Sequence, residues 1–343
     1  MPTIINMPAS LSFTIFWTAV SLCLLPLKTA KTITTFDIDF TNIVKGFAVF
    51  LILYHHTRIY HPQEFWFLFC GGEFYSGVSL FFFVSGIGLS KSINRKHYSF
   101  IGFLKKRFIT VFTGTAICIY LRNLTSFLWG GQFSMTLPFT VLLGFHEWYI
   151  VAILTWYMLF IIIMKLKTNN YELLFFTTIA AFSAWAPLAH FTDQYPMARL
   201  WGRFPFSFAL GIAAADHIDQ IISLIGEHAA KVFIICMIPT TLLVTNGTSH
   251  YPYTIAMDFL SIPLALSLCC YIYKTQLNKS LLITIGKISL PVYLLQVVML
   301  QNNIFYTYTG YNALSLLLTW VTIIILSLAA DFIHKTALRT LKI

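Results

Sequence analysis

Apolar segments of membrane-spanning length recur along almost the whole chain, and they restrict the fold more than any other feature. A helix needs roughly 20 predominantly apolar residues to cross the hydrocarbon core of a bilayer. Only 10% of the 343 residues are charged, whereas soluble domains contain about a quarter. Spanning segments are predicted at 9–27, 42–60, 72–90, 105–122, 147–165, 171–189, 202–216, 231–246, 254–273, 281–300 and 313–334. The sequence therefore predicts an all-α polytopic membrane protein with about eleven transmembrane helices.

Basic residues fall mainly on one side of these predicted helices. Cytoplasmic loops are enriched in Lys and Arg, so the distribution predicts an N-terminus outside and a C-terminus in the cytoplasm. The excess of 22 Lys and Arg over 12 Asp and Glu residues thus reflects topology, and no nucleic-acid partner is expected. The segment 9–27 has no basic residue before it, the reverse of a secretory signal, and is predicted to be a retained span. The connections predicted to be cytoplasmic hold Lys28 and Lys31; Lys91, Arg95, Lys96, Lys105, Lys106 and Arg107; Lys165 and Lys167; Lys231; Lys274 and Lys279; and, in the tail, Lys335, Arg339 and Lys342.

The second predicted span, NIVKGFAVFLILYHHTRIY, carries ionisable residues near both ends. At 100° per residue, Lys45 and His56 differ by roughly 20° in direction and about 16 Å in height, so they share one helix face. His55 points roughly 80° away from Lys45. An ionisable side chain at membrane depth costs about 2.5 kcal/mol or more, so two on one face indicate a functional site. The alternative is a pair of snorkelling or interfacial side chains.

Two further groups lie at the predicted cytoplasmic side. The connection KSINRKHYSFIGFLKKRF contains Lys105, Lys106 and Arg107, which could hold the phosphates of a nucleotide-bearing cofactor or simply anchor the chain to anionic lipids. Ser85 and Gly86 lie near the inner end of the third span, where glycine permits close approach of a ligand or of another helix. No Walker-type or G-x-G-x-x-G loop is present, so ATP hydrolysis and dinucleotide binding have no support.

The connections on the predicted outer side are rich in aromatic residues. Such rings form the usual interfacial belt, although an outward-facing glycan acceptor would also use them. Candidate acceptor contacts are Glu73, Glu147, Trp148 and Arg203, all at outer helix ends. The six cysteines form no C-x-x-C pair and have no metal-ligand spacing with His, so no metal site is expected.

Several motifs, taken in order, resemble the acyltransferase-3 family of integral membrane O-acyltransferases. The family opens with Arg-Gly and a His that follows the Arg after ten intervening residues, and the chain has KGFAVFLILYHH at 45–56, with Lys45 and His56 at these two positions. FFFVSG, KKRF, WYI, RFPFSFALGI and IGKISLPVYLLQ resemble the family's later elements. The resemblance covers roughly residues 36–335, which leaves 1–35 as an additional N-terminal helix before an acyltransferase domain at 36–343. Lys45 replaces the usual Arg and loses its planar fork, and Gln296 replaces a frequent His, so this position is not expected to perform acid–base chemistry.

The resemblance implies transfer of an acyl group, usually acetyl from cytosolic acetyl-CoA, to a hydroxyl of a cell-surface glycan or lipid-linked saccharide such as a capsule or lipopolysaccharide. His56 would be the base or acyl carrier, with His55 as the fallback, and Lys45 would assist catalysis by orienting or stabilising a bound anionic group. Lys45, Ser85, Gly86 and the basic run would hold the donor, and the protein would lie among the lipids of a bacterial inner membrane. The alternatives are a transporter of a glycolipid or small solute, whose paired interrupted helices are not visible in the sequence, and a noncatalytic scaffold.

Overall fold

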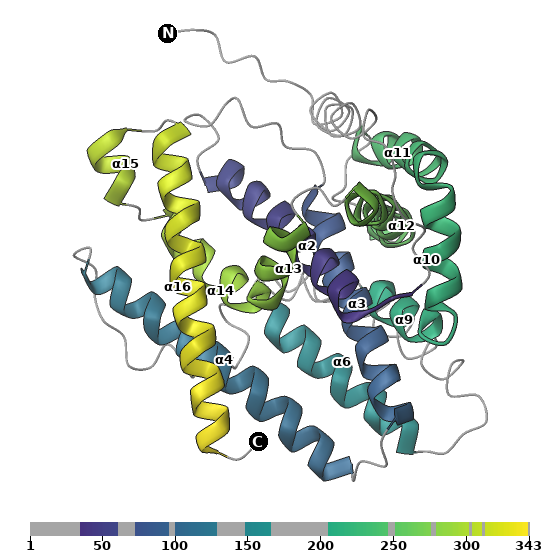
Figure 1. Cartoon of the computed structure of the whole chain (residues 1–343), viewed down its shortest axis with the longest axis horizontal. Coiled ribbons are helices and arrows are strands. Elements are labelled where there is room, and N and C mark those ends of the chain that lie inside the picture. The colour runs from purple at the N-terminus through teal and green to yellow at the C-terminus, as the bar shows by residue number, and fades with distance from the viewer. Residues whose placement is uncertain are drawn as a thin grey trace, which may run out of the picture.

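The structure is a computed structural model that describes residues 35–60, 73–95, 100–128, 148–165, 205–245, 251–275, 279–301, 304–310 and 313–341. Every regular element in these ranges is a helix (Figure 1). The helices are α2 (Ile38–Tyr60), α3 (Glu73–Arg95), α4 (Phe100–Leu128), α6 (Trp148–Lys165), α9 (Pro205–Ala214), α10 (Ile218–Glu227), α11 (Ala229–Thr245), α12 (Tyr251–Thr275), α13 (Lys279–Lys287), α14 (Ser289–Gln301), α15 (Ile304–Thr309) and α16 (Ala313–Thr340).

The membrane character of the chain is evident in these helices. Within the described ranges, 3 helices are long and apolar enough to cross a bilayer, and counting each of 2 sharply bent pairs as one span gives up to 5. Four shorter apolar helices lie in α3, α6, α11 and α12. The protein is thus an all-helical, multi-pass membrane protein. The predicted spans at 9–27 and 171–189, and with the first of them the additional helix at 1–35, lie outside the described residues.

Helix α2 lies at the centre of the bundle. It packs against α3, α12, α13 and α14, while α9 covers another face of α3 and α11 covers α12. Helices α4 and α16 pack against each other and against α14, and in Figure 1 they lie on the opposite side of α2 from α9, α10 and α11. Helix α2 therefore packs against four other helices, which suits a helix with ionisable side chains.

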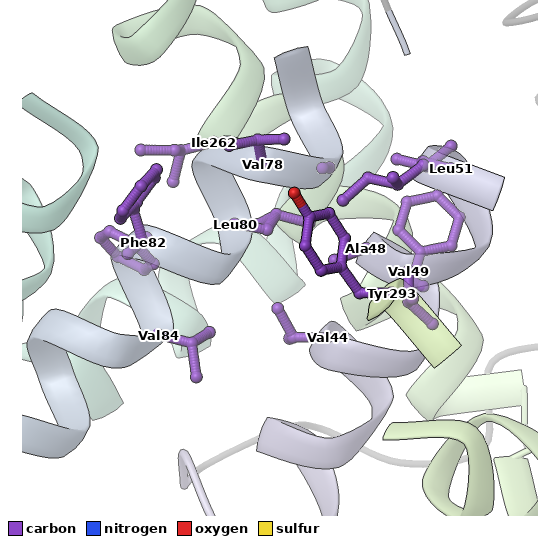
Figure 2. Packing of buried hydrophobic residues seen from close by; sticks show 14 of the residues in the cluster. Val44, Ala48, Val49, Leu51, Val78, Leu80, Phe82, Val84, Ile262 and Tyr293 are labelled. Atoms are coloured by element: carbon purple, nitrogen blue, oxygen red, sulfur yellow. The ribbon is translucent and has the colours of Figure 1, made fainter. Parts of the chain in front are cut away.

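The start of α2 is fixed by a side-chain cap, and its middle by apolar packing. Asp37 precedes the helix, and its Oδ1 accepts a hydrogen bond of 2.7 Å from the Phe40 amide, satisfying one of the free N–H groups at a helix N-terminus. Beyond the cap, Figure 2 shows side chains of α2 and α3 interleaved, with one residue each from α12 and α14: Val44, Ala48, Leu51, Val78, Leu80, Ile262 and Tyr293. In lipid such contacts stabilise through close packing rather than through removal from water.

Glycines bring two pairs of helices into backbone contact. A Cβ on Gly46 would overlap the Leu282 carbonyl of α13, and one on Gly286 would overlap the Asn42 carbonyl of α2. The α3–α9 crossing is built in the same reciprocal way, because Gly86 lies against the Phe208 carbonyl and Gly211 against the Phe83 carbonyl. Small residues at such crossings allow helices to approach closely within a membrane.

Two predicted spans are broken rather than straight. The sequence predicted one span at 281–300, but α13 and α14 meet at an angle of 81° around Ile288. Pro291, in the first turn of α14, has no amide hydrogen for the Lys287 carbonyl, so a helix cannot continue unchanged through this point.

The span predicted at 202–216 ends in a second corner. Helix α9 ends at Ala214, and α10 leaves it at an angle of 100°. The buried residues of α10 are Ile218, Ile222, Ile225 and Gly226, all on one face, whereas Asp219 and Glu227 are exposed. A helix with one apolar and one charged face suits the membrane surface better than the hydrocarbon core.

One end of the bundle is closed by contacts among four helices and Phe36, which lies two residues before α2. The Phe36 amide donates to Asp219 Oδ1 of α10 at 2.6 Å, and Lys91 Nζ of α3 lies 5.7 Å from the Phe36 ring centroid. Lys279 Nζ of α13 lies 4.3 Å from the ring of Tyr273, near the end of α12. The starts of α2 and α13 therefore meet the ends of α3 and α12, as helices running in alternating directions require.

Candidate functional site

Helix α2 holds its two predicted functional residues on one continuous face. The helix runs unbroken from Ile38 to Tyr60, so the spacing of Lys45 and His56 remains about 16 Å along the axis. Both side chains are half-buried. On the same face between them, Val49 and Ile52 are each 1% exposed. The face thus presents a cation and an imidazole separated by two tightly packed apolar side chains.

His56 lies where α2 meets α14. Its ring centroid is 5.8 Å from that of His55 and 5.9 Å from that of Tyr60, both on α2. The side chain of Gln296 approaches it from α14. One residue along, the Trp320 indole N–H of α16 donates to Thr57 Oγ1 at 3.2 Å, which ties α16 to this end of α2. His56 therefore lies beside α14, and α16 contacts the next residue of α2.

Lys45 lies near a second cation, Arg107 of α4. The two side chains are close enough for their charges to interact. Arg107 is also close enough to interact electrostatically with the Tyr157 hydroxyl of α6. Lys45 has no carboxylate partner in the part of the chain that the structure describes. Two like charges that approach each other at partial burial disfavour one another, and an anion bound between them removes that cost.

Ser85 joins this cationic region to the aromatic interior. Its side chain lies within interaction range of the hydroxyls of Tyr149 and Tyr157, two turns apart on α6. The Tyr149 ring lies 5.2 Å from that of Tyr293, whose helix, α14, also carries Gln296. Lys45, Ser85, Arg107, Tyr149 and Tyr157 form one polar cluster, called here the Lys45 cluster, contributed by α2, α3, α4 and α6.

Comparison with protein families gives a match that covers most of the chain. A family model described as an acyltransferase domain, acyltransferase 3, matches residues 38–333. The chain belongs to the acyltransferase-3 family. The protein is therefore a membrane acyltransferase, as the order of its motifs predicted. No curated protein and no solved structure matches the chain significantly.

The acyltransferase brings together only part of the basic run predicted to hold the donor. Arg107 is half-buried and faces the Lys45 cluster, whereas Lys105 and Lys106 are exposed. Gly86 lies next to Ser85 and is buried in the α3–α9 crossing, which gives it a packing role whether or not it also approaches a ligand. Of these three basic residues, Arg107 therefore belongs to the Lys45 cluster, whereas Lys105 and Lys106 lie at the surface.

The predicted acceptor contacts are less completely described. Trp148 is buried in an aromatic cluster, with its ring 6.4 Å from Phe82 and 6.2 Å from Tyr149. Glu73 is the first residue of α3, and its side chain lies outside the described part of the structure. Glu147 and Arg203 lie outside the described residues altogether. Their contact with an acceptor stays a prediction.

Sequence reasoning missed three polar residues of the candidate site: Tyr149, Tyr157 and Gln296. Tyr149 and Tyr157 are eight residues apart in an apolar helix, about two turns in height and roughly 80° in direction, so the helix carries two hydroxyls among apolar side chains. That pattern was the available signal. Gln296 was noted only as a replacement for His. Among the described residues, no group of three His, Cys, Asp or Glu side chains could hold a metal ion.

The two polar regions suit different parts of an acyl transfer. A neutral imidazole can take a proton from a hydroxyl near pH 7, so His56 fits a general base. Lys and Arg side chains bind phosphate oxygens through charge-assisted hydrogen bonds, so Lys45 and Arg107 fit the anionic end of a donor. Both regions adjoin α2, which fixes the distance between them.

Proposed function

We propose that this acyltransferase moves an acetyl group from cytosolic acetyl-CoA to a hydroxyl of a cell-surface glycan or lipid-linked saccharide. The observation that carries the proposal is the arrangement on α2. Lys45, with Arg107 beside it, lies about 16 Å from His56 on one face of a single unbroken helix. One rigid element would thus hold a base at a fixed separation from a phosphate-binding region.

In the proposed reaction, His56 accepts the proton of the acceptor hydroxyl while its oxygen attacks the thioester carbonyl. The C–S bond then breaks, the thiolate leaves as coenzyme A, and the imidazolium returns the proton to the sulfur. Atoms and charges balance without a metal or an oxidant. His56 could alternatively carry the acetyl group on a ring nitrogen between two half-reactions, with the same overall stoichiometry.

The donor would enter from the cytoplasm. Lys45 and Arg107 lie in the end of the bundle that the distribution of basic residues predicts to be cytoplasmic, and the exposed Lys105 and Lys106 lie one turn or less from Arg107 on α4. The bacterial inner membrane is the proposed location, because it supplies cytosolic donor on one face and glycan precursors on the other. Glu73, Glu147, Trp148 and Arg203 remain the proposed acceptor contacts.

The decisive experiment compares surface glycans by mass spectrometry in cells producing the native chain or the His56→Ala chain at matched protein levels. We expect acetyl groups on the glycan with the native chain and their loss, by roughly 100-fold or more, without His56. His55→Ala is the matched control and should retain most activity. Full acetylation by His56→Ala would contradict the assigned role, and its loss only in His55→Ala would transfer that role to His55.

A second measurement tests the donor site. Lys45→Met and Arg107→Met should each raise the KM for acetyl-CoA roughly 10-fold or more in membrane vesicles, because each removes a charged hydrogen-bond donor to phosphate. The kcat should change less than the KM. An unchanged KM in both variants would place the donor elsewhere.

The second candidate function is transport of a glycolipid or small solute, and the bent helix pairs favour it. Transporters often bind substrate at interrupted helices, and α9–α10 and α13–α14 are both interrupted. The sequence had not revealed these breaks. Depletion of acyl-CoA separates the two functions, since an acyltransferase then loses its product, whereas a transporter continues to move its solute.

A further inference from the structure

Gln296 is a buried polar residue that the proposed reaction does not yet use. It is 0% exposed, and neither Oε1 nor Nε2 of its amide has a hydrogen-bond partner in the described part of the chain. Buried amides are almost always hydrogen-bonded, because an unpaired one has lost its hydration without compensation. Val292, Leu295 and Met299 around it on α14 are apolar, so packing alone would be satisfied by another apolar side chain here.

The corner between α13 and α14 brings Gln296 to His56. Helix α13 crosses the first half of α2, where Gly286 lies against Asn42 and Gly46 against Leu282. The chain then turns by 81°, and α14 packs against α2 again. Two turns beyond the corner, the Gln296 side chain comes within interaction range of His56. The bend therefore places the Gln296 amide near the imidazole of His56, which the proposed reaction needs.

We propose that Gln296 is the positioning residue of His56. Its amide oxygen accepts a hydrogen bond from one ring N–H, which leaves the other ring nitrogen as the base that faces the acceptor hydroxyl. A neutral imidazole has one donor and one acceptor nitrogen, and the partner of the first decides which nitrogen is free. Hydrogen bonds of catalytic groups are often long before substrate binds and shorten in the complex. The catalytic consequence rests on the proposed function, but the pairing itself does not.

A neutral amide orients the ring without adding charge. Two ionisable groups of α2, His55 and Tyr60, lie beside the His56 ring. Of these, the charge of His55 acts on His56, and from α14 the neighbouring group is the uncharged Gln296. From α16, the uncharged Trp320 indole reaches this end of α2 at Thr57. A carboxylate introduced at position 296 would therefore place an anion where the native chain has a neutral amide.

The first test does not require acyl transfer. Diethyl pyrocarbonate modifies neutral imidazole, and peptide mass spectrometry of the purified full-length protein measures the rate at His56 as a function of pH. Gln296→Glu places a carboxylate against the ring and favours the charged form, so the midpoint should move upward by about one pH unit or more. An unmoved midpoint in folded Gln296→Glu protein would overturn the pairing, even if the native chain proved not to be an acetyltransferase.

The second test uses near-isosteric variants and keeps the proposal falsifiable if the charged variant does not fold. Gln296→Met removes both amide atoms at similar volume and should lower the kcat roughly 10-fold to 100-fold with an unchanged KM for acetyl-CoA. Gln296→His restores a hydrogen-bond acceptor and should recover part of the loss. Native kcat in Gln296→Met would overturn the proposal.

A matched control separates positioning from general packing. Ser261 on α12 is also 0% exposed, and its Oγ has no hydrogen-bond partner in the described ranges. Ser261→Ala removes an equally buried polar atom outside the proposed site, so its kcat should stay within about twofold of native. An equal loss of kcat in Ser261→Ala and Gln296→Met would show that position 296 acts only through packing, and the proposal would fall.

Discussion

At the scale of single residues, Ser85 links two tyrosines of the Lys45 cluster, Tyr149 and Tyr157. A serine hydroxyl can donate one hydrogen bond and accept two, so it can satisfy both Tyr149 and Tyr157 at once. Both tyrosines are 9% exposed. Removing the Ser85 hydroxyl would leave two buried phenolic hydroxyls without this polar neighbour, in a region where water cannot fully replace it.

Ser85→Ala should therefore destabilise the protein by about 1–3 kcal/mol, the cost of leaving a buried polar group unpaired. Thermal unfolding of the purified protein in detergent would measure the change. Tyr157→Phe removes one hydroxyl and leaves Ser85 with Tyr149, so its effect should be smaller. If Ser85→Ala unfolded at the native temperature while the KM for acetyl-CoA rose, Ser85 would bind the donor rather than join the tyrosines.

The sequence predicted the residues of this site only where helical periodicity sufficed. Lys45 and His56 followed from their spacing on one helix, and the structure retains that spacing. Arg107 was predicted only as part of a run with Lys105 and Lys106, because periodicity within α4 does not show which of the three faces another helix. The position of Gln296 near His56 depends on the corner between α13 and α14, which no local sequence pattern predicted.

At the scale of helices, the reciprocal glycine contacts fix which surfaces can meet. Gly86 and Gly211 place α3 and α9 backbone against backbone. Gly88, two residues after Gly86, is exposed and would have no atom within 4 Å of an added Cβ. The two glycines share one helix and differ in environment, so they form a matched pair.

Gly86→Ala should destabilise the α3–α9 crossing by about 1–3 kcal/mol or more, since the added methyl meets backbone that cannot rotate away. Gly88→Ala should be neutral or stabilise by up to about 1 kcal/mol, because alanine is the better helix former. The yield and unfolding temperature of both variants would be compared. Equal behaviour of the two would contradict the packing role of Gly86.

The helix ends and the corners differed in how well the sequence predicted them. The spans at 42–60 and 147–165 were predicted to within a few residues, because long apolar runs with charged ends define them. The corner before Pro291 was not predicted, since Pro239 lies inside continuous α11 and Pro263 inside continuous α12. A proline leaves one backbone carbonyl of its helix without an amide partner. Whether the helix breaks there depends on whether nearby side chains, water or another helix can hydrogen-bond that carbonyl.

At the scale of the whole molecule, α16 connects the two sides of the predicted topology. Thr309, at the end of α15, and Arg339, near the end of α16, are both exposed. Figure 1 shows α15 and the C-terminus at opposite ends of α16. The distribution of basic residues predicts that the C-terminal end faces the cytoplasm.

Single cysteines at these two positions would test the orientation. In a chain without its native cysteines, a membrane-impermeant maleimide added to intact cells should label Thr309→Cys and not Arg339→Cys. Permeabilised cells should label both, which controls for reactivity. Labelling of Arg339→Cys alone in intact cells would invert the predicted topology and place the Lys45 cluster on the outer side, away from cytosolic acetyl-CoA.

The lengths of α4 and α16 have a consequence for the surrounding lipid. The helices contain 29 and 28 residues, or about 43 and 42 Å, whereas the hydrocarbon core is about 30 Å thick. In α16 the apolar run ends before Asp331, which pairs with Lys335 at 2.6 Å. The last turns of α16 therefore extend beyond the hydrocarbon into the headgroup layer, where α4 carries Lys105 and Lys106 on the same predicted side. Anionic headgroups would gather around this projecting edge, and the thickness and charge of the local bilayer would become part of the enzyme's surroundings.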